Sequence, residues 1–262
     1  MFSVLPDVEE SRKEIKEFWL DDFESDAYSL GHMDSLKTFD VDEKNPEGAV
    51  ANDVVISIVS GMSKKNKQIV KDTVLLSSMG ARKKFPAGGI ATYNEFIRRM
   101  SLCGWTFQHS AMSTYTTESS RFTLEQEGLK ILASAVSAMA LPGPTSALML
   151  KVAKDTIDVL RANDKPLRLF ESSSKTKDGV GLSIASAVES DGEVLMAVGA
   201  IDLATSLDVT NVLFWEWNSS SVSVNRGECQ MFLNHRHFES VQSEIEKVLT
   251  EAARKALMDF EI

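Results

Sequence analysis

The C-terminal half of the chain has the hydrophobic and polar pattern of successive β-strands. Strands are predicted over residues 167–171, 180–189, 193–205 and 212–217, followed by a ribbon over 222–233. Asp191-Gly192 and Arg226-Gly227 are pairs typical of tight hairpin turns. Because strands joined by such short turns run antiparallel, the pattern predicts an antiparallel sheet. Two earlier strands are expected over residues 54–59 and 105–117.

Apolar residues at helical spacing fill most of the remaining chain. Ser63 is a typical N-cap for a helix to about residue 84, and Thr92 with Glu95 forms a capping box for a helix to about residue 103. Further helices are predicted over about 7–20, 123–141, 145–162 and after Asn234. Helical pairs, a β-meander and a last covering helix predict an α+β fold in which an antiparallel β-sheet is covered by helices.

Charge separates two neighbouring parts of the chain. Residues 21–53 hold ten carboxylates and two lysines, whereas residues 61–102 hold nine basic residues and two carboxylates. Asn-Pro and Glu-Gly pairs near residue 48 are typical of a linker. We therefore predict an acidic N-terminal arm over 1–48 and a single α+β domain over 49–262. Because opposite charges tethered in one chain attract, the arm is expected to cover the basic helix.

The basic helix supplies the candidate binding patch for an anionic partner, either an anionic membrane surface or a protein. Its residues are Lys64, Lys65, Lys67, Lys71, Arg82, Lys83 and Lys84. The net charge of −10 argues against a general role in nucleic-acid binding. Trp215 and Trp217 are candidates for contact with a membrane interface or a carbohydrate, although packing within the sheet is the simpler interpretation.

The sequence contains no recognisable catalytic, nucleotide-binding or cofactor motif. Serine triplets at 172–174 and 219–221 lack a Gly-x-Ser-x-Gly setting. Cys229, His235 and His237 are the one candidate metal group, but a helix capped by Asn234 would point the two histidines apart. We therefore predict no catalytic residue, no metal and no cofactor, and favour a non-enzymatic function.

Cysteine content and hydropathy bear on the location of the protein. Cys103 and Cys229 are expected to be buried thiols in a reducing compartment, with a single disulfide as the alternative. The N-terminus lacks a signal-peptide pattern, and the apolar stretch at 131–150 is interrupted by Pro-Gly-Pro. These features predict a soluble cytoplasmic protein, with release by a non-classical route left open.

Four sequence blocks resemble a family of uncharacterised bacterial and fungal proteins. The blocks are residues 66–76, 104–108, 168–172 and 213–222. The resemblance spans most of residues 54–262 and implies no activity. The order of elements is also similar, at the level of fold alone, to Cyt-type cytolysins, in which helices wrap a sheet that reorganises at membranes. That similarity implies membrane action and assigns no functional residue.

Three functions remain open from the sequence. The leading one is a non-enzymatic, membrane-active or virulence-associated effector whose acidic arm covers a basic helix. The second is an intracellular binding or scaffold module that forms homo-oligomers through a sheet edge or the apolar helical hairpin. The third is an enzyme without a recognisable motif, which an exposed polar pocket would favour.

Overall fold

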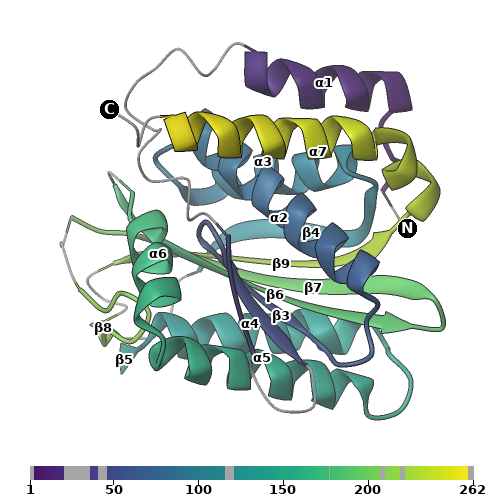
Figure 1. Cartoon of the computed structure of the whole chain (residues 1–262). Helices are drawn as coiled ribbons and strands as arrows, with labels where there is room; N and C mark the ends of the chain where they lie inside the picture. Colours follow the sequence, from purple (N-terminus) through teal and green to yellow (C-terminus); the bar gives the residue numbers. More distant parts are fainter. Residues whose placement is uncertain are drawn as a thin grey trace.

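A seven-stranded sheet lies between two layers of helices (Figure 1). The computed structural model describes residues 3–20, 36–40, 46–115, 121–176, 178–206, 210–218 and 222–258. The strands are β1 (Leu36–Asp40), β2 (Glu47–Ala51), β3 (Val54–Ile58), β4 (Trp105–Tyr115), β6 (Gly179–Ser190), β7 (Glu193–Ala204) and β9 (Ser223–Leu233). Their order is β1-β2-β3-β6-β7-β9-β4, and only the β3–β6 pair among these described strands is parallel. The α+β prediction is therefore confirmed.

Each face of the sheet is covered by its own helical layer. The first layer contains α2 (Lys64–Lys84), α3 (Gly89–Leu102) and α7 (His235–Met258), and α1 (Val8–Leu20) packs on α7. The second contains α4 (Leu124–Ala138), α5 (Thr145–Arg161) and α6 (Asp164–Ser174). A two-residue ladder of β5 (Arg121–Phe122) and β8 (Trp217–Asn218) lies apart from the main sheet.

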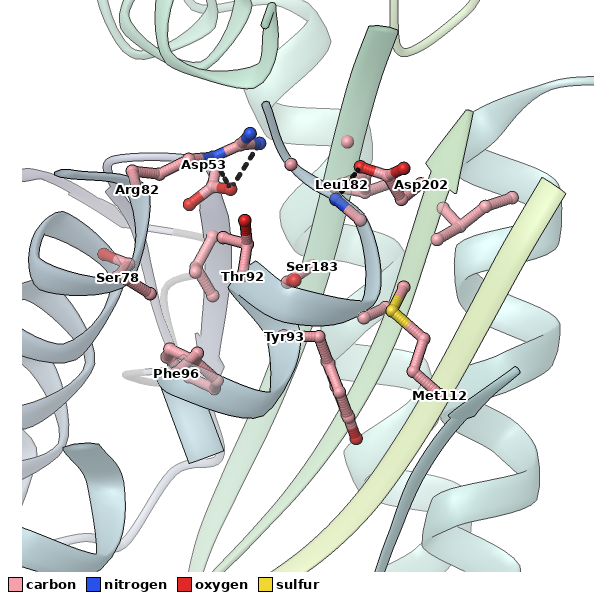
Figure 2. Close-up of a pocket in the computed structure, with 17 residues that line it drawn as sticks. Asp53, Ser78, Arg82, Thr92, Tyr93, Phe96, Met112, Leu182, Ser183 and Asp202 are labelled. Atoms are coloured by element: carbon pink, nitrogen blue, oxygen red, sulfur yellow. Dashed lines mark hydrogen bonds and ion pairs between the residues drawn. The ribbon is translucent and has the colours of Figure 1, made fainter. Parts of the chain in front are cut away.

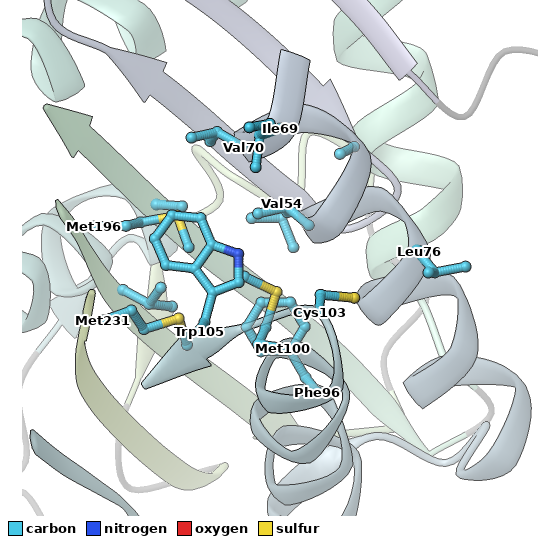
Figure 3. Packing of buried hydrophobic residues seen from close by; sticks show 14 of the residues in the cluster. Val54, Ile69, Val70, Leu76, Phe96, Met100, Cys103, Trp105, Met196 and Met231 are labelled. Carbon is cyan, nitrogen blue, oxygen red and sulfur yellow. The ribbon is translucent and has the colours of Figure 1, made fainter. Parts of the chain in front are cut away.

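Strand alternation explains how one sheet supports two apolar cores. Ile56 and Val198 face the first layer, whereas their neighbours Val55 and Ala197 face the second. Trp105 is fully buried in the first core among methionines and aliphatic side chains (Figure 3). Its indole Nε1 donates a hydrogen bond to the Thr73 hydroxyl at 3.0 Å, so its polar atom is satisfied within the core.

Local capping signals in the sequence were mostly correct. The Ser63 hydroxyl accepts a bond from the Asn66 amide, and the Thr123 hydroxyl accepts one from the Gln126 amide. The Asn234 side chain likewise accepts a hydrogen bond from the backbone N–H of residue 237 at 3.0 Å. These caps fix the starts of α2, α4 and α7, where orphan N–H groups need acceptors.

Four local predictions were wrong. α3 begins at Gly89 rather than Thr92, whose hydroxyl donates to the carbonyl of Phe85 at 2.7 Å instead of capping the helix. Residues 167–171 belong to helix α6, because Pro166, Leu169 and Phe170 are buried at helical spacing. Residues 212–217 form mainly a turn, and only Trp217 of that segment joins β8.

The predicted turn at Arg226-Gly227 is also wrong, since β9 passes through both residues and pairs with β7 along its length. Gly227 instead makes room for an aromatic ring: a Cβ there would lie 2.9 Å from ring atoms of Tyr93. The glycine therefore permits a close approach between α3 and the sheet.

The described parts of the N-terminal segment contact the rest of the protein. Glu14 of α1 forms an ion pair with Arg98 of α3, and Arg12 donates to the backbone carbonyl of Ser240 in α7. β1 and β2 belong to the main sheet, so the predicted boundary at residue 48 falls within β2. Residues 21–35 and 41–45, which carry many of the acidic side chains, lie outside the described residues.

Candidate functional site

A small pocket with both apolar and charged lining residues lies between the first helical layer and the sheet (Figure 2). Small residues of β6 and β7, namely Gly181, Ser183 and Ala200, form its floor, and the turn from α2 to α3 forms one wall. Its volume is about 40 Å³. One water needs roughly 10–15 Å³ by the same measure, so the pocket has room for a few waters.

An aspartate–arginine–aspartate group lines this pocket. Arg82 Nε and Nη2 both lie 2.8 Å from Asp53 Oδ2, while Asp202 Oδ2 accepts a hydrogen bond from the Gly89 backbone amide at 2.9 Å. Burial raises the pKa of Asp202, and the negative charge of Asp53 raises it further. The hydrogen bond from Gly89 and the positive charge of Arg82 lower it, but they do not cancel the effect of burial. Arg82 Nη1 is buried without a hydrogen-bond partner among the described residues.

Glycines allow the backbone to approach this charged group. Gly88 has a φ of 85°, and a Cβ there would lie 2.8 Å from Asp202 Oδ2. A Cβ on Gly181 would lie 3.1 Å from Arg82 Nη2. Glycine at both positions lets the turn before α3 pack directly on β6 and β7. The Asp53–Arg82–Asp202 group thus fastens the α2–α3 turn to the sheet.

The chemistry available in the pocket is limited. Pockets for organic ligands typically have volumes of about 300–1,000 Å³, far above the volume found here. Among the described lining residues no nucleophile is hydrogen-bonded to a base, and Thr92 and Gly89 donate their hydrogen bonds to the protein itself. This pocket is therefore too small for a typical organic ligand.

The predicted basic patch divides into paired groups. Glu47 of β2 lies 2.8 Å from the Lys71 ammonium and 3.4 Å from that of Lys67, and both lysine side chains are largely buried. Burial alone would raise the pKa of Glu47. The hydrogen bonds and positive charges of Lys71 and Lys67 outweigh burial, so the pKa of Glu47 is lowered. Arg82 points into the pocket toward Asp53. Three of the seven predicted cations thus contact carboxylates of the sheet region.

The other four predicted cations are more accessible. Lys65 pairs with Glu239 at 3.1 Å, and Lys84 pairs with Glu95 at the same distance. Lys64 is exposed in the first turn of α2, and Lys83 is half-buried in its last turn. Binding of an anionic partner by the seven residues stays a prediction.

The aromatic candidates do not form one surface. Trp217 is buried in the second core, whereas Trp215 is 45% exposed. Between them in the sequence, Glu216 pairs with Arg121 at 3.1 Å. Phe214, which precedes Trp215, stacks against the Arg161 guanidinium, with 4.2 Å between the guanidinium carbon and the ring centre. A shared exposed face of two indoles is absent because this segment is a turn rather than a strand.

Among the sulfur and imidazole candidates, Cys103, Cys229 and His237 are buried, whereas His235 is half-buried. Cys103 and Cys229 are both free and buried, and burial raises the pKa of each thiol to about 12. His237 Nε2 lies 3.2 Å from the carbonyl oxygen of Leu102. Within the described residues, no group of three His, Cys, Asp or Glu side chains has metal-binding geometry.

The end of the α4–α5 hairpin has an unusual surface. The 20 residues from Ile131 to Leu150 contain no charged side chain. Their exposed members include Ala138, Ala140, Pro142, Pro144, Ala147 and Leu148. Lys130 and Lys151 border the uncharged run, with side chains 70% and 67% exposed. We call residues 131–150 the hairpin end.

Comparison with known proteins leaves the chain without a family. No family model matches it, and no curated protein is detectably similar to it. Among solved structures, the "Structure of the Evf virulence factor" has a TM-score of 0.32 and 10% identity, covering 95% of this chain and 90% of that chain. This weak likeness assigns no residue and no activity. In the described part of the chain, no helix combines the length and hydropathy needed to cross a bilayer.

Proposed function

We propose that the protein is a non-enzymatic, membrane-active effector that contacts lipid surfaces through the hairpin end. The observation that carries this proposal is the run of 20 uncharged residues, 131–150, which includes the end of α4, the connecting turn and the start of α5, and is bordered by Lys130 and Lys151. A quarter of the whole chain is charged, so the absence of charge on the exposed side of this hairpin end departs strongly from the rest of the protein.

The lysines at the border suit the geometry of an interfacial contact. Eight residues separate Lys130 from the end of α4, which corresponds to about 12 Å of helix. Interfacial segments insert their apolar faces by about 5–10 Å, and lysine stems extend along apolar surface while the ammonium stays with the headgroups. The hairpin end can therefore enter the headgroup region while Lys130 and Lys151 remain beside lipid phosphates.

Such a contact requires no unfolding of the domain. The inner face of the hairpin is already buried against the sheet by Leu132, Met149 and Ile157. Only the outward side chains near Pro142 and Leu148 would enter the interface. The proposal therefore concerns shallow attachment, and dye leakage is expected only if α4 and α5 also leave the sheet.

The acidic N-terminal region has a complementary role in this proposal. Glu47 pairs with Lys71, and Asp53 pairs with Arg82, so acidic side chains near the arm neutralise cations of α2 and of the pocket. We infer that this covering directs membrane contact away from α2 and toward the hairpin end.

Vesicle co-sedimentation tests the proposal. Full-length protein should sediment with vesicles of phosphatidylcholine and phosphatidylglycerol, and Leu148→Asp should weaken this binding by about tenfold or more, because a carboxylate is costly to move toward acyl chains. Leu148 is in the first turn of α5, where an acidic residue is compatible with the helix dipole. The fold should therefore survive the substitution.

Gln126→Asp is the matched control, since it adds the same charge to the exposed first turn of α4, at the opposite end of the hairpin. It should leave vesicle binding close to that of the unmodified protein. Absence of sedimentation by the unmodified protein, or equal weakening by both substitutions, would contradict membrane contact through the hairpin end.

A further inference from the structure

The outer edge of β4 lacks the features that usually prevent strands from pairing with other chains. β4 lies at one end of the sheet and pairs only with β9 among the described strands. Its 11 residues include no Lys, Arg, Asp, Glu or Pro. Natural edge strands are commonly protected by charge, proline, shortness or a covering segment. β4 has a register shift after Phe107 and a covering segment at Phe107, and among the described residues neither extends over residues 110–114.

The N-terminal segment covers the beginning of the β4 edge. The Ser3 amide donates to the Phe107 carbonyl at 2.8 Å, and the Phe107 amide donates to the Ser3 hydroxyl at 2.9 Å. A register shift follows between Phe107 and Ser110, after which regular pairing with β9 continues through residue 115. Over residues 110–114, alternate backbone N–H and C=O groups point away from β9, as they must on any edge strand.

The side chains along this edge are small or uncharged. Ala111, Ser113 and Thr114 are exposed, and Met112 packs toward the first core. Next to the covered end, Val4 is 93% exposed, the highest exposure among the large hydrophobic residues described. An open row of backbone groups thus lies beside an apolar side chain that the described part of the chain leaves in solvent.

We propose that residues 110–114 of β4 pair antiparallel with the same residues of a second copy of this chain, forming a two-fold dimer with a continuous sheet. An antiparallel strand pair related by a two-fold axis is self-complementary in its hydrogen bonds. The absence of charge on β4 lets the strand face its own copy without like-charge repulsion, despite the net charge of −10. Each strand contributes about 17 Å of edge.

The opposite edge of the sheet fits a second copy less well. β1 has only five residues, and it carries Lys37 and Asp40. In a self-pair these charges would be brought close to their own copies in some registers, which restricts pairing. Because self-pairing is favoured at the β4 edge alone, two copies should form a closed dimer, and the sheet should not grow further by addition of more copies at the β1 edge. This inference is independent of the membrane proposal, because β4 is an edge strand of the sheet, whereas the hairpin end belongs to α4 and α5.

Sedimentation velocity over a range of protein concentrations tests the dimer. The unmodified protein should shift from monomer to dimer as concentration rises. The double variant Ala111→Lys/Ser113→Lys should remain monomeric, because an overlap centred on Met112 would place the new lysines directly opposite each other. The matched control, Gln126→Lys/Ser172→Lys, adds the same charge at exposed positions of α4 and α6 and should dimerise like the unmodified protein.

Hydrogen exchange of the unmodified protein gives a test that needs no variant. Amides between residues 110 and 114 should exchange at least several-fold more slowly at dimer concentrations than at dilution, while other edge amides are unchanged. The proposal is overturned if the unmodified protein stays monomeric at all concentrations, as it would if this edge instead bound an extended segment of another protein. It is also overturned by dimerisation without protection of these amides.

Discussion

The two helical layers are attached to the same sheet by different forces. In the first layer, ion pairs link helices to the sheet region and to each other: Asp53–Arg82 and Glu47–Lys71 have little solvent access, and the buried Glu95 of α3 pairs with Lys84 of α2. In the second layer, the attachment of α4 and α5 to the sheet is almost wholly apolar, and the Arg161–Glu125 pair between them is at the surface. Separating the first layer from the sheet would therefore expose charged groups, whereas separating the second layer would expose apolar side chains.

That difference bears on membrane action. Moving α2 or α3 away from the sheet would leave charged groups without partners, which is costly in any medium of low polarity. Moving α4 and α5 would expose mainly apolar side chains, which a bilayer can solvate. If the protein reorganises at a membrane, the second layer is the one that can move, and the hairpin end belongs to that layer (Figure 1).

The largest predicted effect is loss of the buried carboxylate in the first layer. Glu95 is 5% exposed and lies within 3.1 Å of Lys84, Arg98 and Arg99. Glu95→Gln removes the charge that compensates these three cations, so the free energy of unfolding should fall by about 3 kcal/mol. Urea unfolding, monitored by circular dichroism, measures this change.

The same substitution in the second layer provides the control. Glu125 pairs with Arg161, whose side chain is 53% exposed, so Glu125→Gln should reduce the free energy of unfolding by less than about 1 kcal/mol. Similar losses for the two variants would show that ion pairing does not distinguish the layers.

A smaller effect is predicted where α4 lies closest to the sheet. A Cβ on Gly199 of β7 would lie 2.6 Å from the Leu132 amide nitrogen and 3.1 Å from the Gly128 carbonyl oxygen. Gly199→Ala should therefore push α4 outward and reduce stability by about 1–3 kcal/mol. Amide exchange in α4 should accelerate, while exchange in α2 and α3 should change little.

Gly80→Ala makes the corresponding change in the first layer. The new Cβ would meet the Arg99 guanidinium, a flexible side chain, and alanine favours a helix over glycine by about 0.5–1 kcal/mol. This variant should be less destabilised than Gly199→Ala and should leave exchange in α4 unchanged. Faster exchange in all helices of Gly199→Ala would contradict selective loosening of the second layer.

Sequence reasoning succeeded where the determining contact is local. Ser63, Thr123 and Asn234 cap helices through amides three residues away, so the signal and its structural cause lie in one short segment. Thr92 with Glu95 has the same spacing, yet tertiary contacts determine both side chains: Thr92 bonds Phe85, and Glu95 meets cations from α2 and α3. Spacing alone cannot separate these two cases.

The pocket and the parallel strand pair depend on contacts far apart in the sequence. Asp53, Arg82 and Asp202 come from the β2–β3 turn, α2 and β7, and only the fold brings them together. The β3–β6 pair joins strands separated by most of the helices. Gly88 and Gly89 lie at the pocket, but a glycine pair in the sequence does not indicate which distant side chains it will contact. The hairpin end was visible as an apolar stretch, but its exposure required the structure.

The smallest predicted effect is a pH dependence that originates in the first layer. Burial between α2 and α7 raises the pKa of Asp72 to about 6, against the hydrogen bond from Gln68 and the charge of Lys71. In the unfolded chain the value is about 3.9, so between about pH 4 and pH 6 the folded state binds more protons than the unfolded state. Stability attributable to Asp72 therefore falls as pH rises through this window, and the loss is complete above the folded pKa. Asp72→Asn keeps an acceptor for Gln68 and removes the charge, so it should stabilise the protein at pH 7 by on the order of 1 kcal/mol and flatten the stability profile between pH 4 and 6.

Glu95 acts in the opposite direction at lower pH. Its pKa is lowered to about 2 by Arg98, Lys84 and Arg99, against the effect of burial. Its contribution to stability is therefore present above about pH 4.5 and is lost toward pH 2. Thermal unfolding of Asp72→Asn and of the unmodified protein, measured at half-unit pH intervals, distinguishes the contributions of Asp72 and Glu95. Parallel pH profiles of the two proteins between pH 4 and 6 would exclude Asp72 as the source of the pH dependence in that range.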